Sequence, residues 1–213
     1  TGHGRRMAGL PLHPRLAHML LEAQRHGAEA EACNLAGVLG ERDFVRFPAG
    51  EYDSDLGLRL DIMAGPGEGR RADSGRFTVD RPALRRCLRA AEALRRRMDR
   101  SSRPLRRQPI GRMLAWAYPD RIGQRRPGVR GRFLLSNGRG AFFSSPEPLA
   151  SDDYIVAAEL DGDRREARVF LAAACDPGAI LEDFDQVLEA RETIAWDKRT
   201  AAVRMERSLC LGA

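Results

Sequence analysis

A short stretch near the middle of the chain carries arginines at a spacing suited to binding phosphate groups. Arginine makes paired hydrogen bonds to phosphate oxygens, and its planar head group also stacks on bases. The tripeptide Asn137-Gly138-Arg139 follows this stretch and is typical of a tight hairpin turn. The tip of such a turn can present backbone N–H groups to a further phosphate. The predicted nucleic-acid-binding residues are Arg121, Arg125, Arg126, Arg130, Arg132, Asn137, Gly138 and Arg139.

The positive charge of the chain is concentrated in the same region. Residues 81–132 contain seventeen arginines and three acidic residues, whereas the whole chain has a net charge of only +6. Local basicity of this kind indicates a polyanion site. The alternative is a solvated surface in a protein that uses arginine in place of lysine, since Lys198 is the single lysine. Arg85, Arg89 and Arg96 fit that alternative better, because a helix face is often basic for solubility alone.

Sequence patterns of several enzyme classes are missing. A phosphate-binding P-loop needs a lysine directly after glycine, and Lys198 has no glycine near it. Neither a G-x-S-x-G nucleophile motif nor an H-E-x-x-H metal helix occurs. His13 and His18 are five residues apart, a spacing that does not place two ligands on one helix face. Because the four cysteines form no C-x-x-C pair, we expect reduced thiols and no metal site.

Acidic residues gather toward the end of the chain and leave a hydrolase as an open alternative. Two carboxylates at the right separation could act as general acid and general base. None of their spacings is diagnostic of such a pair, so we expect solvated turn residues and no catalytic residue in this chain. The acids in question are Glu159, Asp161, Asp163, Glu182, Asp183 and Asp185.

Aromatic side chains near the basic stretch have two candidate roles. For Trp116, Tyr118 and Phe133 we favour packing in a core over base stacking, because small barrels fill their interiors with aromatic residues. Phe142 and Phe143 are adjacent in a predicted strand, so their side chains point to opposite faces. The outward ring of this pair is the better candidate for stacking on a base.

The first hundred residues have the 3–4 spacing of apolar residues that indicates amphipathic helices, and we predict a helical bundle. Pro14 suits a first helical turn and Gly27 suits a left-handed stop. Ser54 and Asp80 are placed to cap the helices that follow them. The predicted helices span residues 14–26, 28–42, 55–64 and 81–98, with loops at 44–53 and 65–79.

After a proline-containing linker at 101–109, the apolar pattern changes to the alternation typical of strands. Short helices are predicted at 110–117 and 177–184, and Asp161-Gly162 marks a second tight turn. Several short strands indicate a small antiparallel barrel, best matched by an OB-like barrel, with a sandwich as the alternative. The predicted strands span residues 132–136, 141–144, 154–160, 165–173, 189–196 and 201–211.

The chain is therefore predicted to be an α+β protein with a helical domain over residues 1–105 and an OB-like β-rich domain over residues 106–213. No apolar run approaches the roughly 18 residues of a membrane span, and no signal peptide is recognised. We expect a cytoplasmic location and no membrane partner. The missing initiator Met and the strand-like run just before Ala213 predict an excised piece of a longer protein.

Two motifs resemble the accessory region of DEAH-box RNA helicases. Residues 4–20 read GRRMAGLPLHPRLAHML and resemble the G-x-x-M-A-x-L-P-L-x-P-x-L-A-x-M-L pattern at the start of the helicase-associated helical module. Residues 117–126, AYPDRIGQRR, and 131–141, GRFLLSNGRGA, resemble the bacterial HrpB type of this family. With VAAELDG at 156–162, the match covers nearly all of the chain in order. It departs at Gly123, where the family usually has Ala, and in the glycine-rich insert at 65–79.

The resemblance implies a parent enzyme that couples ATP hydrolysis to movement along RNA. Its motor domains, which would bind ATP and Mg²⁺, and its winged-helix domain would lie upstream of Thr1. This chain would hold no cofactor, and its partners would be single-stranded RNA or another nucleic acid together with those domains. The predicted function is non-catalytic guidance of an RNA strand by a helical ratchet module and an OB-like module. The alternatives are a protein-interaction module that docks an acidic partner, and an unrecognised hydrolase.

Overall fold

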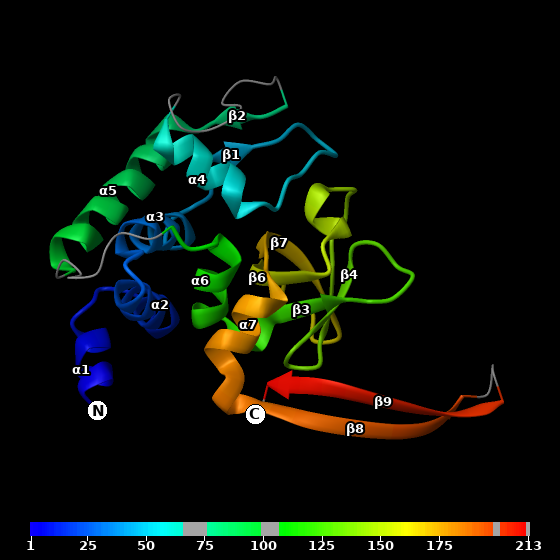
Figure 1. Cartoon of the computed structure of the whole chain (residues 1–213). Coiled ribbons are helices and arrows are strands. Elements are labelled where there is room, and N and C mark those ends of the chain that lie inside the picture. Colours follow the sequence, from blue (N-terminus) through cyan, green and yellow to red (C-terminus); the bar gives the residue numbers. More distant parts are fainter. Residues whose placement is uncertain (66–75, 99–106, 198–200, 212–213) are drawn as a thin grey trace.

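The computed structural model describes residues 1–65, 76–98, 107–197 and 201–211, with the backbone alone at residues 197, 204 and 206–209. Figure 1 shows a group of helices from the first half of the chain, a small barrel beside them, and a long hairpin that projects from the barrel. Residues 66–75 of the predicted loop at 65–79, and residues 101–106 of the predicted linker at 101–109, lie outside the described residues.

Local signals place the helices of the first half. α2 (Pro14–Arg25) begins with proline and ends before Gly27, which has the positive φ of 71° that favours glycine. Asp80 accepts a hydrogen bond from the Ala83 N–H and caps α5 (Arg81–Arg97), as predicted. The described helices lack the length and apolar character needed to cross a bilayer. The other helices of this half are α1 (Gly2–Ala8), which was not predicted, α3 (Glu29–Leu39) and α4 (Leu56–Ala64).

The start of α4 differs from the prediction. Its cap is Asp55, whose Oδ1 accepts a hydrogen bond from the Gly57 N–H at 2.8 Å. Ser54 is fully buried and bonds to a distant glutamate instead, so the helix begins one residue later than a Ser54 cap would place it. The two predicted loops also contain the short antiparallel strands β1 (Val45–Arg46) and β2 (Thr78–Val79).

Five strands close into a barrel with the order β3-β4-β5-β7-β6. Four of them were predicted, whereas β3 was missed because it is short and directly follows a 3-10 turn (η1, Pro119–Arg121). The barrel is not wholly antiparallel as predicted. β5 and β7 are parallel. The chain changes direction between β5 and β6 and again between β6 and β7, so β7 runs in the same direction as β5. The strands are β3 (Ile122–Arg125), β4 (Arg132–Leu135), β5 (Gly140–Phe142), β6 (Tyr154–Leu160) and β7 (Glu166–Ala174).

The last two predicted strands do not join this barrel. β8 (Leu188–Asp197) and β9 (Ala202–Leu211) pair with each other, and no other described strand pairs with them. The resulting hairpin extends well beyond the barrel (Figure 1). The predicted helix α7 (Pro177–Phe184), capped by Asp176, and the turn η3 (Asp185–Val187) connect β7 to it.

α6 (Ile110–Ala117) packs between the helices and the barrel (Figure 1). The larger hydrophobic cluster is continuous across this helix, with Leu20 of α2, Met113 of α6 and Leu171 of β7 all buried in it. Gly111 allows the close approach, because a Cβ there would lie 2.0 Å from the carbonyl oxygen of Ala174. The predicted domain boundary at residue 105 falls outside the described residues and stays a prediction.

Candidate nucleic-acid interface

The eight predicted binding residues lie in two groups at opposite ends of β4. The turn between β3 and β4 carries Arg126 and Arg130, flanked by Arg125 on β3 and Arg132 on β4. At the other end of β4, the turn into β5 holds Asn137, Gly138 and Arg139. This turn lies against η1, which contains Arg121, because the Asn137 N–H donates to the Asp120 carbonyl oxygen.

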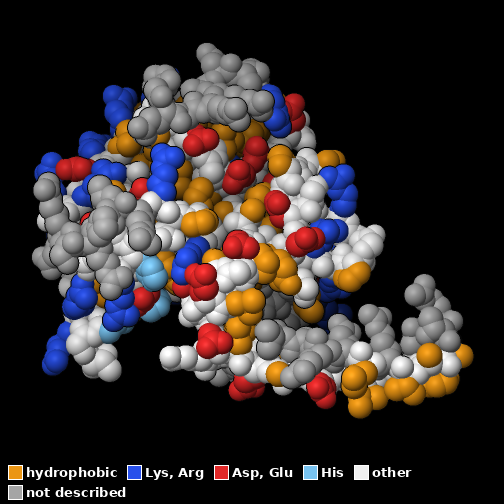
Figure 2. Space-filling model, in the orientation of Figure 1, with side chains coloured by type: hydrophobic (Ala, Val, Ile, Leu, Met, Phe, Trp, Pro, Cys, Tyr) orange, Lys and Arg blue, Asp and Glu red, His pale blue; other side chains and the backbone are white. Residues whose placement is uncertain are grey.

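Most of these arginines have partners within the protein. Arg125 forms an ion pair with Asp153 at 2.6 Å, and Arg132 forms one with Glu166. Figure 2 shows basic and acidic side chains next to each other over the barrel. Each of these ion pairs is partly exposed, and exposed pairs contribute only about 0–1 kcal/mol. Each ion pair therefore contributes little to holding its arginine side chain in place.

Arg121 and Arg139 are held more firmly. Arg121 Nη1 donates to the Ala158 carbonyl oxygen at 2.8 Å, and its guanidinium lies 4.8 Å from the centre of the Tyr118 ring. The Arg139 side chain donates to the Asp163 carbonyl oxygen. Arg121 thus connects η1 to β6, and Arg139 connects the β4–β5 turn to the turn between β6 and β7. Fewer of the N–H donors in this group are free than the sequence suggested.

The turn at Gly138 does not present free backbone donors. The Gly138 N–H donates to the Leu135 carbonyl oxygen, and the Arg139 N–H donates to Asn137 Oδ1. The Asn137 N–H is also used, as described above. Gly138 does have the positive φ, 83°, that the turn requires. The predicted turn is confirmed. Its three N–H groups have acceptors within the protein, and phosphate binding at its tip stays a prediction.

Arg126 and Arg130 remain the most available cations of the set. Within the described residues, no carboxylate lies within ion-pair distance of either. Arg130 donates to the hydroxyl of Ser151, and Arg126 lies over β5, where a Cβ on Gly140 would be 3.1 Å from Arg126 Nη2. Both side chains are exposed. The end of the barrel formed by the β3–β4 turn is therefore the better candidate for an anion-binding surface.

A row of cationic and aromatic side chains crosses the outer face of the barrel next to this turn. Arg132, Phe142 and Arg168 are register partners on β4, β5 and β7, so their side chains point to the same face. The Arg132 guanidinium lies 5.8 Å from the centre of the Phe142 ring. This face combines rings and arginines, the combination on which single strands stack.

The row continues onto residues that were not predicted from the sequence. Arg168 lies 5.1 Å from the ring centre of Phe170 and 6.0 Å from that of Tyr52. The two rings are in turn 6.5 Å apart and nearly perpendicular. The alternation along β7 could have placed Arg168 and Phe170 on the outer face. Nothing local could have placed Tyr52 there, because it comes from a loop of the helical part.

The other aromatic residues near the basic stretch are divided between the core and the surface. Phe133 and Trp116 are buried, at 0% and 6% exposure, so packing is confirmed as their role, and Phe143 is also buried. Phe142 is the outward ring of its pair. Gly123 faces the barrel interior, where a Cβ would lie 3.0 Å from Leu135 Cδ2. The alanine usual in the family would therefore need Leu135 to shift by a few tenths of an ångström.

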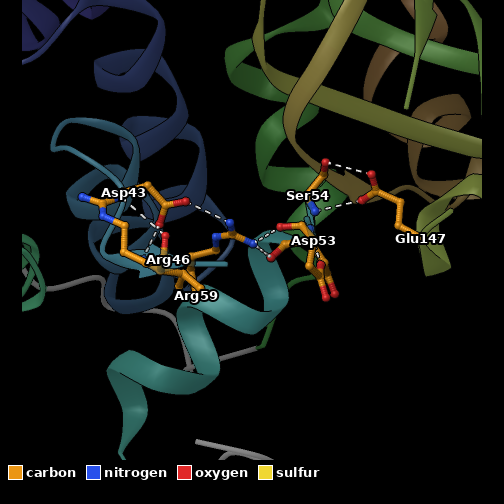
Figure 3. Close-up of polar contacts among 8 residues, drawn as sticks. Asp43, Arg46, Asp53, Ser54, Arg59 and Glu147 are labelled. Carbon is orange, nitrogen blue, oxygen red and sulfur yellow. Dashed lines mark hydrogen bonds and ion pairs between the residues drawn. The ribbon is translucent and has the colours of Figure 1, made fainter. Parts of the chain in front are cut away.

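A buried polar cluster fixes the helical part against the barrel (Figure 3). Glu147 accepts hydrogen bonds from the Ser54 N–H at 2.8 Å and from the Ser54 hydroxyl at 3.1 Å. Burial raises the pKa of Glu147, while the two Ser54 bonds act in the opposite direction. On α4, the buried Arg59 donates to Asp43 at 2.9 Å and to the carbonyl oxygens of Asp53 and Asp55. These contacts set the position of the loop that carries Tyr52.

The projecting hairpin has an apolar face. Ile194 is the register partner of Met205, and Trp196 is the partner of Val203, so the four side chains share one side. They are 60–68% exposed. Figure 2 shows hydrophobic side chains along this outer part of the hairpin. Contiguous apolar surface of this kind is typical of a contact with another protein surface.

Thiols and possible metal ligands lie away from the barrel face. Burial raises the pKa of the Cys33 thiol to about 11 and that of Cys175 to about 12, so neither thiol ionises near neutral pH. The four cysteines are free. Among the described residues, one group of three side chains has ligand atoms close enough together for a metal ion, namely His3, His18 and Glu22.

Comparison with known proteins by sequence and by structure finds the same relative, HrpB of Escherichia coli. No protein-family model matches the chain. The chain is 27% identical over 214 residues to the ATP-dependent RNA helicase HrpB of Escherichia coli (strain K12), and the match covers all of this chain. Two crystal structures, of the E. coli DExH-box NTPase HrpB and of the Escherichia coli DEAH/RHA helicase HrpB, superpose with TM-scores of 0.68 and 0.69, at 28% and 26% identity.

The match is complete for this chain but partial for its relatives. The chain spans 23% of the length of HrpB in each of the three comparisons. The sequence resemblance and the fold thus agree on the same protein, and both extend over the helices and the barrel. The chain is therefore similar along its whole length to a region of the Escherichia coli helicase HrpB that makes up 23% of that protein.

Proposed function

We propose that this chain is a non-catalytic nucleic-acid-binding region of an ATP-dependent RNA helicase, and that it guides a single RNA strand across the outer face of the barrel. The observation that carries the proposal is the row formed by Arg132, Phe142 and Arg168 beside the available cations Arg126 and Arg130. Arginines would hold phosphates, and the rings would stack on bases without reading their sequence.

The barrel is proposed to be an OB-like module. Its strand order, with a parallel pair between the third and fifth strands in sequence, is what we expect of a five-stranded Greek-key barrel. In that fold the second and third strands form the ligand-binding face. Those strands correspond here to β4 and β5, which carry Arg132 and Phe142. The position of the cationic and aromatic row therefore supports the same surface.

The parent protein is proposed to be a cytoplasmic enzyme that hydrolyses ATP with Mg²⁺ and moves along RNA. ATP would be bound by motor domains of the same polypeptide, because this chain contains no glycine-lysine pair for a P-loop. Those motor domains and a winged-helix domain are its proposed partners. The apolar face of the β8–β9 hairpin is the surface that we assign to contacts with them.

The proposal is tested by the salt dependence of RNA binding. Two unrelated single strands are titrated into wild type and into the double variant Arg126→Ala, Arg130→Ala at several salt concentrations. Removing one arginine–phosphate interaction should flatten the slope of log affinity against log salt by roughly 0.7, so the double variant should flatten it by roughly 1.4 for both strands. The matched control is Arg85→Ala with Arg89→Ala, which removes the same charge from the exposed face of α5.

Three outcomes separate the alternatives. Equal effects in the two double variants would mean diffuse attraction to a basic protein and would contradict a site on the barrel. Tight binding of an acidic peptide, with weak RNA binding, would favour the protein-docking function. Weaker binding accompanied by a lower melting temperature would show that the arginines stabilise the fold, whereas removing exposed phosphate ligands should leave stability almost unchanged.

A further inference from the structure

His3, His18 and Glu22 come together from two helices at the N-terminal end of the structure. His18 and Glu22 are four residues apart on α2, so their side chains lie on the same face of that helix. His3 lies in the first turn of α1, which packs against α2. The five-residue spacing of His13 and His18 gave no sign of this grouping, because α1 was not predicted.

The distances among these three side chains suit a small metal ion. One ligand atom from each residue lies within 4.8 Å of the other two, and His3 Nε2 is 2.8 Å from His18 Nδ1. In a tetrahedral site with bonds of about 2.0–2.1 Å, ligand atoms are roughly 3.3–3.5 Å apart. To reach that spacing, the two imidazole nitrogens must separate by about 0.5–0.7 Å, and the most distant ligand atoms must approach by at most about 1.5 Å.

The chemistry of the donors selects the class of metal. Two imidazole nitrogens and a carboxylate oxygen suit a borderline divalent ion such as Zn²⁺, whereas Ca²⁺ and Mg²⁺ prefer oxygen ligands alone. A hydrogen bond between His3 and His18 requires at least one of the rings to be neutral and therefore able to donate an electron pair. Glu22 is paired with Arg25 at 3.0 Å on the surface, a contact weak enough to be exchanged for a metal.

A metal here would also satisfy a structural need. α1 buries none of its seven residues, so few apolar contacts hold it in place. We propose that His3, His18 and Glu22 form a zinc site that fastens α1 to α2, with a water molecule or another external group as the fourth ligand. This site is separate from the barrel face and independent of the proposed RNA-binding function.

The test is direct metal binding by the purified, reduced, metal-free chain. Zn²⁺ is titrated in competition with a chromophoric chelator, and Co²⁺ is used as a spectroscopic substitute. We expect one saturable site per chain and at least a tenfold loss of affinity in His3→Ala and in His18→Ala. The control is His13→Asn, which removes an exposed histidine but keeps a side-chain acceptor at the start of α2. His3→Ala cannot disturb the core, because α1 contributes no buried residue.

A second readout reports on the helix itself. Zn²⁺ should slow proteolysis between α1 and α2, near Leu10 and Leu12, at least severalfold in wild type and in His13→Asn but not in His18→Ala. The proposal is overturned by absence of saturable Zn²⁺ binding in wild type, or by unchanged affinity in the double variant His3→Ala, His18→Ala. Thiolate-to-cobalt charge-transfer bands would also overturn it, since they would place the metal on a cysteine.

Discussion

Ser54 and Glu147 lie 93 residues apart in the chain and are joined by two hydrogen bonds in the interior, from the Ser54 N–H and from its hydroxyl. Ser54 precedes α4, and Glu147 lies in the segment between β5 and β6. The pair therefore connects the helical part to the barrel at the loop that brings Tyr52 beside Phe170. One end of the cationic and aromatic row thus depends on a buried polar contact.

Replacing Glu147 with alanine should destabilise the fold by about 1–3 kcal/mol, because the buried N–H of Ser54 would lose its acceptor. The free energy of unfolding is measured by urea titration. The matched control is Glu51→Ala, which removes a carboxylate from an exposed position. Similar destabilisation in the two variants would mean that the hydrogen bonds between Ser54 and Glu147 do not contribute to the free energy of unfolding.

The contribution of Glu147 should also depend on pH. Burial raises its pKa in the folded protein above that of an unfolded glutamate, about 4.3, while the Ser54 bonds partly oppose this. The folded state then holds the proton more tightly, so this contribution to stability is present below about pH 4.3 and disappears as pH rises through the folded pKa. Wild type should therefore lose stability relative to Glu147→Gln as the pH rises above about 4.3. If the free energy of unfolding varies with pH in the same way for the two proteins, the raised pKa of Glu147 is contradicted.

Arg59→Ala should be among the most damaging single changes, with a loss of stability of about 3–5 kcal/mol. The Arg59 side chain is fully buried. Its removal leaves Asp43 without its ion-pair partner and two backbone carbonyl oxygens without the guanidinium donor. Arg42→Ala, an exposed neighbour of Asp43, should change the melting temperature little. A small effect of Arg59→Ala would mean that water replaces the guanidinium.

Phe142→Ala should weaken single-strand RNA binding by about 1–3 kcal/mol if one base stacks on this ring. The slope of affinity against salt should stay the same, because no charge is removed. Leu134→Ala serves as the control, since Leu134 is an exposed apolar side chain on the outer face of β4 without a ring. Equal effects of the two changes would indicate general apolar contact in place of stacking.

The chain by itself should not turn over ATP, with or without RNA. Its one lysine, Lys198, lies far from any glycine pattern that could surround a phosphate chain. Phosphate release is measured over the range of RNA concentrations used for binding. Turnover that exceeds a no-protein control and survives a second purification step would contradict this prediction and revive the hydrolase alternative.

Local sequence was sufficient to determine most elements of the fold. Proline at the start of α2, Asp80 before α5 and Asp176 before α7 act on the nearest turns of the backbone, so their effects are readable without tertiary information. Arg132 was likewise predicted to bind at the surface and Phe133 to pack in the core, and the structure places the first outward and the second inward. The whole-length resemblance to an HrpB-type helicase was readable from the same local motifs.

Tertiary structure decided which of these elements meet. The alternation of apolar and polar residues along a strand shows which of its side chains share a face. It does not show which other strand pairs with it. The parallel pairing of β5 with β7 and the separation of the β8–β9 hairpin therefore could not be read from it. Two further contacts could not be read from the sequence. Ser54 was predicted to cap a helix but bonds to Glu147, and His3 lies beside His18 and Glu22, which are fifteen and nineteen residues away in the chain. Such contacts depend on closing long loops around a common core, and the free energy that selects them is distributed over many residues far apart in the chain.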